Sequence, residues 1–176
     1  MQTLPAIRDA RPEDFPAILR LNLESEAFLS PLPLPRLQAL HAQAWYHRVA
    51  GIEGSVAAFL LALRPGADYD SPNYRWFAER YPEFAYIDRI VVGAASRKAG
   101  LANLLYRDLF QRAADAGIRS ITCEFDIEPP NEASRRFHER LGFVEVGSQR
   151  VGGGRKTVAL CELRLDAVSA RRPGPG

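Results

Sequence analysis

The chain of 176 residues has few of the residues that build disulfide or metal frameworks. It contains only two cysteines, Cys123 and Cys161, and both lie in runs typical of β-strands. Such sparse usage is typical of a reducing compartment and does not support a disulfide framework. We therefore expect both thiols to be small core residues. His41 and His47 form no metal-ligand constellation with nearby cysteines, so we expect no metal.

Long hydrophobic runs and an excess of one charge are also missing. No apolar stretch approaches the roughly 20 residues that a transmembrane helix needs, and residues 1–10 lack the regions of a signal peptide. The 23 Lys and Arg residues nearly balance the 21 Asp and Glu residues, so the charge pattern of nucleic-acid binders is absent. We expect a cytoplasmic protein that binds neither nucleic acid nor a membrane.

What the sequence does contain is enough apolar material for one compact core. Hydrophobic residues make up 47% of the chain, and a chain of this length falls in the range of a single domain. We assign residues 1–166 to that domain. Residues 167–176 are expected to form a flexible tail because of their composition.

The first half predicts two helices and a hairpin. A helix begins at Pro12, with Phe15 and Ile18 on its apolar face, and a second follows the proline-rich residues 30–35. Residues 46–50 and 56–63 predict two antiparallel strands. Residues 64–84 then predict a long functional loop rich in proline and aromatic side chains.

The second half predicts a strand, a helix and a second strand that runs parallel to the first. Residues 86–92 and 118–127 are the strands, and the helix between them ends at Gly117. A short helix follows Asn131, which offers an N-cap side chain, and ends at Gly142. Residues 143–151 and 157–165 predict two final strands.

The most specific motif lies where the strand 86–92 turns into the following helix. It consists of Arg97, Lys98, Ala99, Gly100, Leu101 and Ala102. The first N–H groups of a helix lack partners and carry partial positive charge, so a diphosphate docks there. Gly100 and Ala102 allow close approach, and Arg97 and Lys98 add charge. The alternative is an ordinary solvated loop with two surface cations.

This turn, together with the segment from Asn131 to Phe143, resembles the GNAT N-acetyltransferase superfamily. Arg97, Gly100 and Ala102 fall on the fixed positions of the family pattern Q/RxxGxG/A, and residues 131–143 look like its NxxAxxxYxxxxGF segment. Residues 7–22 also resemble the family's first strand and helix. The resemblance covers nearly the whole chain from Ala6 to Leu165.

The resemblance implies an α/β (α+β) fold and acetyl-CoA as co-substrate. The fold has a mixed, mostly antiparallel sheet of six or seven strands with a central splayed parallel pair, flanked by about four helices. The cofactor would lie where the parallel strands splay apart. The implied contacts are Ile90, Val91 and Val92 with the pantetheine arm, residues 97–102 with the pyrophosphate, and Asn131, Ser134 and Phe137 with the cofactor.

Three departures from the family pattern bear on the site. His138 falls where most relatives carry the tyrosine that protonates the departing thiolate, and a histidine can supply a proton at neutral pH. The alternative is a surface histidine on a short helix. Ser134 replaces a small apolar residue, and Ala94 stands where a proline is common. The loss of that proline leaves the loop conformation before Arg97 open.

The acceptor amine needs a base, because an alkylammonium has a pKa of about 10 and only its neutral form attacks a thioester. Asp88 and Glu124, each on one of the two predicted parallel strands, are the candidate catalytic carboxylates, with Asp126 close by in sequence. Asp88 ranks first because relatives frequently place an acid on that strand. The alternative is that each carboxylate simply pairs with a cation such as Arg89.

The aromatic segment predicts the acceptor side of the site. Tyr69, Tyr74 and Trp76 are the candidate substrate-binding residues, and the alternative is that they only pack the loop over the sheet. We expect an N-acetyltransferase that acts on the primary amine of a small molecule. A non-catalytic acyl-CoA-binding regulatory domain and a protein or peptide N-acetyltransferase stay open as alternatives. Pairing of the C-terminal strands in a homodimer is also possible.

Overall fold

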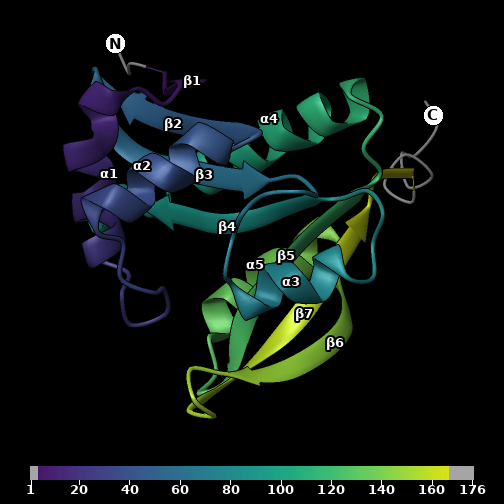
Figure 1. Cartoon of the computed structure of the whole chain (residues 1–176). Helices are drawn as coiled ribbons and strands as arrows, with labels where there is room; N and C mark the ends of the chain where they lie inside the picture. Colours follow the sequence, from purple (N-terminus) through teal and green to yellow (C-terminus); the bar gives the residue numbers. More distant parts are fainter. Residues whose placement is uncertain (1–3, 167–176) are drawn as a thin grey trace. The chain divides into compact units, whose positions relative to one another are not determined.

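A computed structural model of the chain describes residues 4–166 (Figure 1). The chain divides into two compact units, Met1–Ala67 with Ile87–Gln111 and Asp68–Tyr86 with Arg112–Gly176. The assignment of residues 1–166 to a single domain stays a prediction. The predicted tail, residues 167–176, lies outside the described residues.

The first unit contains an antiparallel sheet with helices packed against it. Its elements are β1 (Ala6–Asp9), α1 (Phe15–Leu23), α2 (Leu34–Gln43), β2 (Tyr46–Ile52), β3 (Ser55–Leu63), most of β4 (Ala85–Val92) and the first part of α4 (Leu101–Asp115). β2 pairs antiparallel with both β1 and β3, so the predicted hairpin is confirmed. Along β2, Tyr46 bonds to α4 and His47 to α2. Successive side chains of a strand point to opposite faces, so the two helices cover opposite faces of β2.

The second unit contains three antiparallel strands and two helices. Its elements are α3 (Pro72–Ala78), the start of β4, β5 (Ser120–Glu128), α5 (Glu132–Leu141), β6 (Val144–Val151) and β7 (Lys156–Arg164). β7 pairs antiparallel with β5 and with β6. β4 and β5 are parallel, with Ala85 opposite Ile121 and Tyr86 opposite Thr122.

The predicted fold class is confirmed. Hydrogen bonds join seven strands in the order β1-β2-β3-β4-β5-β7-β6, and β4–β5 is the parallel pair. The described residues form five α-helices, where about four were expected. Within residues 4–166, no helix combines the length and apolar character needed to cross a membrane.

The prediction of an unbroken loop over residues 64–84 is wrong, because this segment contains α3. Ser71 is the N-cap, and its Oγ accepts a hydrogen bond from the Tyr74 N–H at 3.4 Å. Pro72 occupies the first helical position, where its missing N–H costs nothing. Tyr74 and Phe77, three residues apart, are both buried. Proline therefore begins this helix instead of excluding it.

Both cysteines are core residues, as predicted. Cys123 on β5 lies directly opposite Cys161 on β7, and each is 2% exposed. Burial raises the pKa of the Cys123 thiol well above its usual value and raises that of Cys161 to about 12. The two thiols are therefore protonated and poorly nucleophilic at neutral pH.

Candidate functional site

The predicted phosphate loop connects β4 to α4 through two left-handed residues. Lys98 has φ +81° and Gly100 has φ +74°. A lysine in this conformation is uncommon and costs conformational energy, which structures retain mainly at functional sites. Arg97, Lys98, Ala99 and Gly100 are all exposed. The loop is thus an accessible and strained turn that carries two cations.

Gly100 caps α4 with its backbone. Its carbonyl accepts the Leu104 N–H at 3.0 Å, so the N–H groups of Leu101 and Ala102 belong to the first turn and have no carbonyl of the helix to bind. A Cβ built on Gly100 meets nothing within 4 Å. Glycine is needed here for its positive φ, and the space beside it is open.

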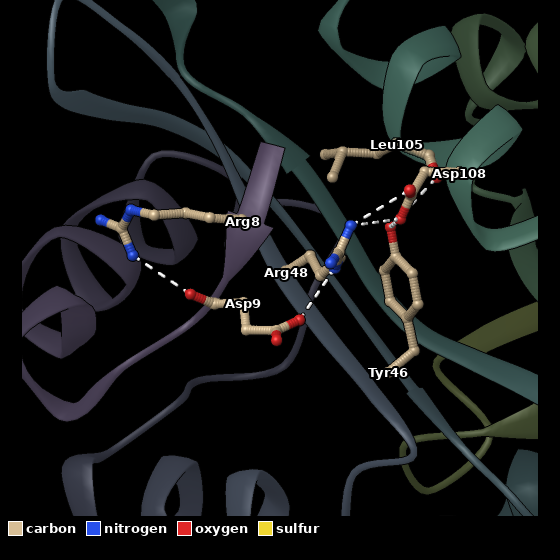
Figure 2. A network of polar contacts seen from close by, with 6 residues as sticks. All are labelled: Arg8, Asp9, Tyr46, Arg48, Leu105 and Asp108. Carbon is tan, nitrogen blue, oxygen red and sulfur yellow. Dashed lines mark hydrogen bonds and ion pairs between the residues drawn. The ribbon is translucent and has the colours of Figure 1, made fainter. Parts of the chain in front are cut away.

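A polar network holds α4 against β2 and β1 (Figure 2). The Tyr46 hydroxyl lies 2.7 Å from Asp108 Oδ2, and Arg48 Nη1 lies 3.1 Å from both oxygens of the same carboxylate. Arg48 Nε also donates to Asp9 Oδ1 at 2.8 Å. On its apolar face, α4 buries Leu101 and Leu105. These contacts fix the position of the helix that follows the loop.

The start of the loop is held by α1 and β3. Gly93 donates its N–H to the Ala57 carbonyl at 2.9 Å, and the Ala94 N–H donates to Glu24 Oε2 at 3.0 Å. A proline at position 94 would lack this donor. Alanine at this position, where the family pattern commonly has proline, therefore makes a hydrogen bond that proline could not make. Its acceptor, Glu24, was not among the residues predicted from the sequence.

Among the implied pantetheine contacts, Val91 is buried, whereas Ile90 and Val92 are half-buried. Asp88, which precedes them on β4, is held in a buried ion pair. Its carboxylate lies 3.0 Å from Arg89 Nε, and the two side chains are 6% and 2% exposed. Arg89 Nη1 also donates to Asn22 Oδ1 and to the Ser30 carbonyl, both at 2.8 Å. The pairing named as the alternative for Asp88 is the one observed.

Glu124 has a different partner. The Tyr86 hydroxyl donates to Glu124 Oε1 at 2.9 Å, and both residues lie in the second unit. Tyr86 is fully buried, and its ring contacts Tyr74 at 5.6 Å and Phe77 at 6.0 Å between centroids. Tyr86 was not among the predicted site residues. Asp126, also on β5, pairs with Lys156 at 2.9 Å.

The three predicted substrate-binding aromatics make packing contacts. Tyr69 and Tyr74 are 8% and 3% exposed, and their ring centroids lie 5.7 Å apart. Trp76 is half-buried and covers Gly147 so closely that a Cβ there would lie 2.6 Å from its Cζ2. The Arg80 guanidinium lies 4.2 Å from the centre of the Trp76 ring. The packing role named as the alternative is therefore present for all three side chains.

Helix α5 begins and ends as predicted. Asn131 is the N-cap, and its Oδ1 accepts the Ser134 N–H at 3.2 Å. Gly142 ends the helix with φ +102°. Phe137 is half-buried on the same helix. The Asn131 side chain thus has a structural task, and its contact with a cofactor stays a prediction, as do those of Ser134 and Phe137.

His138 is buried in an aromatic cluster, so the alternative of a surface histidine is wrong. The ring is 3% exposed and stacks on Phe125 at 5.7 Å, with Phe137 and Phe143 at its edges. Its Nδ1 lies 2.7 Å from the Ser134 carbonyl, which only accepts, so Nδ1 carries a proton. Burial lowers the pKa of the ring, although the Ser134 carbonyl opposes this. The ring is thus favoured in its neutral form, with the lone pair on Nε2.

The residues described above match a known family. The model of the Acetyltransferase (GNAT) family matches residues 5–143. A curated relative, the phosphinothricin N-acetyltransferase of Streptomyces viridochromogenes, is 29% identical over 105 residues, which cover 60% of this chain and 50% of the relative. The match therefore spans half the length of that relative.

Solved structures share the fold at low identity. The ribosomal-protein-S18-alanine N-acetyltransferase of Escherichia coli has a TM-score of 0.70 at 17% identity, covering 92% of this chain and 94% of its own. YncA of Salmonella typhimurium, solved with its cofactor acetyl-CoA, has a TM-score of 0.69 at 19% identity and 98% coverage of both chains. At these identities the likeness shows the fold alone.

Proposed function

The chain belongs to the GNAT acetyltransferase family, and from this premise we propose that it binds acetyl-CoA and transfers the acetyl group to a primary amine. The observation that carries the proposal is the first turn of α4. Two left-handed residues and two exposed cations directly precede the N–H groups that the helix leaves without carbonyl partners. Such a turn suits a diphosphate.

The residues present fit this co-substrate. The loop is open beside Gly100, and the two cations that precede it, Arg97 and Lys98, are exposed. When bound, acetyl-CoA supplies the activated thioester. The proposed contacts are Ile90, Val91, Val92, Arg97, Lys98, Ala99, Gly100, Leu101, Ala102, Asn131, Ser134 and Phe137. Backbone N–H groups near Ile90 to Val92 are proposed to stabilise negative charge on the thioester oxygen.

We assign the base to Glu124 ahead of Asp88. The Asp88 carboxylate is tied to a buried guanidinium, whereas Glu124 is half-buried and hydrogen-bonded to a neutral hydroxyl. Glu124 takes a proton from the ammonium group, directly or through water, and leaves the neutral amine. The amine nitrogen then bonds to the acetyl carbon, the carbon–sulfur bond breaks, and the thiolate receives the second amine proton.

His138 is kept out of these steps. A general acid at Nε2 requires a protonated ring, and burial disfavours that charge. The acid role implied by the family pattern stays a prediction, and the neutral ring with its proton on Nδ1 counts against it.

The proposed acceptor is a small molecule with a primary amine. The relative matched in sequence is a phosphinothricin N-acetyltransferase, which supports this class. The ribosomal-protein-S18-alanine N-acetyltransferase shares the fold at 17% identity and is the basis for the rival class of protein acceptors. We propose that three aromatic side chains shape the acceptor side of the site by packing helix α3 in place: Tyr69, Tyr74 and Trp76.

The experiment that tests the function is thiol release from acetyl-CoA over a panel of acceptors. The panel contains phosphinothricin, other small primary amines and short peptides with free N-termini. Release with a small amine, unaffected by excess peptide, supports the proposal. Release only with peptides contradicts the acceptor class. Binding of acetyl-CoA without release for any acceptor contradicts catalysis and favours an acyl-CoA-binding regulatory domain.

A further inference from the structure

The loop between β4 and α4 is joined to the end of α1 at two consecutive residues. Leu21 packs against Gly93 so closely that a Cβ there would lie 2.9 Å from Leu21 Cδ2. Three residues after Leu21, Glu24 accepts the Ala94 N–H on its Oε2 at 3.0 Å. Residues three apart lie on the same side of a helix, so one side of α1 holds the start of the loop. All four residues belong to the first unit.

Glu24 holds the loop from a fixed place in the fold. It is the C-cap of α1, its backbone is helical with φ −62° and ψ −18°, and its N–H donates to the Arg20 carbonyl at 3.3 Å. Within the described part of the chain, the bond from Glu24 to Ala94 is the one that a side chain makes to residues 93–100. Removal of this carboxylate therefore releases the loop at one point and leaves its backbone hydrogen bonds in place.

The backbone around this bond has the shape that a proline would fix. Gly93 has φ −56° and ψ 144°, the extended conformation that a residue before proline adopts, and it has no Cβ to clash with a proline ring. Ala94 begins the short 3₁₀ helix η2 (Ala94–Ser96), whose turn is closed by the Ser96 N–H on the Gly93 carbonyl at 2.9 Å. Ala94 thus occupies the second position of the turn, where the preset φ of proline is favoured.

The hydrogen bond to Glu24 and a proline ring are alternative restraints on the same turn. Proline at position 94 would restrict the backbone through its ring and would have no N–H to donate. Alanine leaves the backbone freer, and its N–H is instead held by the Glu24 carboxylate. The left-handed residues Lys98 and Gly100 follow this turn. A loop that is already ordered loses less conformational freedom when it binds a ligand.

We propose that Glu24 is a positioning residue of the cofactor site, and that its bond to Ala94 preorganises residues 94–100 for the diphosphate of acetyl-CoA. The inference rests on the proposed function, because it gives Glu24 a part in binding that co-substrate. Glu24 acts through the Ala94 N–H, so the role requires an acceptor oxygen at this place and does not require a negative charge.

Calorimetric titration of acetyl-CoA tests the role with three single substitutions. Glu24→Ala removes the acceptor and is expected to weaken binding by about three- to tenfold. Glu24→Gln keeps an acceptor oxygen and is expected to retain most of the affinity. Glu26→Ala removes another exposed carboxylate two residues further along and is expected to bind as tightly as the wild type. Circular dichroism checks that each variant is folded.

Ala94→Pro completes a double-mutant cycle with Glu24→Ala. The ring holds the turn without the N–H, and the exposed Glu24 carboxylate is free to turn to solvent, so A94P is expected to bind acetyl-CoA at least as tightly as the wild type. In that background, E24A is expected to change the affinity less than about twofold. Equal losses from E24A in both backgrounds, or no loss in either, would overturn the proposal. Tighter binding by both E24A and E24Q would also overturn it, because Glu24 would then act on the diphosphate through its charge.

Hydrogen exchange of the free proteins separates this inference from the proposed function. Exchange at the N–H groups of residues 93–100 is expected to be faster in E24A than in the wild type or E24Q, and E24A is expected to have no such effect in the A94P background. Unchanged exchange in E24A, with acetyl-CoA bound equally well by every variant, overturns the role of Glu24 alone. The expected exchange pattern without binding of acetyl-CoA by the wild type contradicts the proposed function, and the cofactor role of Glu24 with it.

Discussion

The turn that begins α4 and the carboxylate region around Glu124 are built in opposite ways. The turn is exposed, carries two cations, and owes its shape to two left-handed residues that lie two positions apart in the sequence. Glu124 is half-buried and owes its position to Tyr86, a residue on another strand that is itself held by the aromatic side chains of α3. One region depends on local backbone conformation, and the other depends on packing across the fold.

This difference separates two kinds of sensitivity to mutation. Changes in the turn act on an accessible surface, so they alter what it binds more than they alter stability. Changes around Glu124 act on buried neighbours, so they affect chemistry and packing together.

The largest effect is expected from Glu124→Gln. If Glu124 accepts the amine proton, this substitution lowers kcat by about a hundredfold or more, because a positioned base contributes on that scale. Tyr86→Phe removes only the hydroxyl at 2.9 Å and is expected to lower kcat by about tenfold. Thiol-release kinetics measure both.

Glu128→Gln, on the same strand, serves as the comparison for Glu124. Its carboxylate accepts a hydrogen bond from Thr157 at the exposed end of β5, so kcat is expected to stay unchanged. Equal losses in E124Q and E128Q, or none in either, would remove Glu124 from the mechanism. Acetyl-CoA affinity is expected to be the same in all three variants.

The next effect concerns the pH dependence of stability. Burial lowers the pKa of His47 from 6.5 to about 4. The neighbouring His41, whose Nδ1 lies 2.8 Å from the Nδ1 of His47, also lowers this pKa. The unfolded chain therefore takes up a proton at a higher pH than the folded chain does. The contribution of His47 to the free energy of unfolding is complete above pH 6.5. It is lost as the pH falls toward 4, and the loss is about 3 kcal/mol at most.

Urea unfolding between pH 7.5 and 4.5 measures this loss. His47→Leu is expected to flatten the pH dependence, because it removes the buried titrating ring. The lowered pKa of His138 acts in the same direction and leaves a residual slope. An unchanged slope in the His47 variant would show that other groups govern acid sensitivity.

A smaller effect is expected where α3 meets β6. Gly147→Ala places a Cβ 2.6 Å from Trp76 Cζ2, and an indole ring has little freedom to move away. The free energy of unfolding is expected to fall by about 1–3 kcal/mol. Ser148→Ala, the next residue and exposed, is expected to be neutral. If G147A is neutral as well, α3 does not depend on this contact, and the proposed shaping of the acceptor side loses its support.

The smallest effect is expected from His138→Phe. The ring lies among three phenylalanines, and the substitution keeps its aromatic packing. Because the neutral ring holds its proton on Nδ1, kcat is expected to stay within about threefold. A loss of a hundredfold that His138→Tyr restores would instead establish the acid role that the family pattern implies.

Sequence reasoning succeeded where short-range chemistry decides the structure. Asn131 and Gly142 bound α5 as predicted, and the strand, turn and helix around Gly100 follow from local patterns. The helix α3 was missed because its prolines were read as breaks in the chain. The signal was available, since Ser71 followed by Pro72 is a typical N-cap and first helical position.

Contacts that join distant residues could not be predicted from the sequence. The pairing of Asp88 with the adjacent Arg89 was open as an alternative, but the bond from Arg89 to Asn22 on α1, 67 positions away, was not foreseen. The bond from Tyr86 to Glu124 joins residues 38 positions apart. The sequence did carry a signal for the burial of His138, because Ser134, His138 and Leu141 recur at helical spacing.

The proposed function depends on the binding of the acetyl-CoA diphosphate at the first turn of α4. Calorimetric titration of acetyl-CoA into the wild type, Gly100→Glu and Gly117→Glu measures this binding. Both glycines are exposed, have nearly equal φ values of +74° and +72°, and are open at their Cβ positions, but Gly117 lies beyond the other end of the same helix. We expect at least about a hundredfold weaker binding in G100E and wild-type affinity in G117E. Equal affinity in all three proteins, or no binding by the wild type, would contradict it.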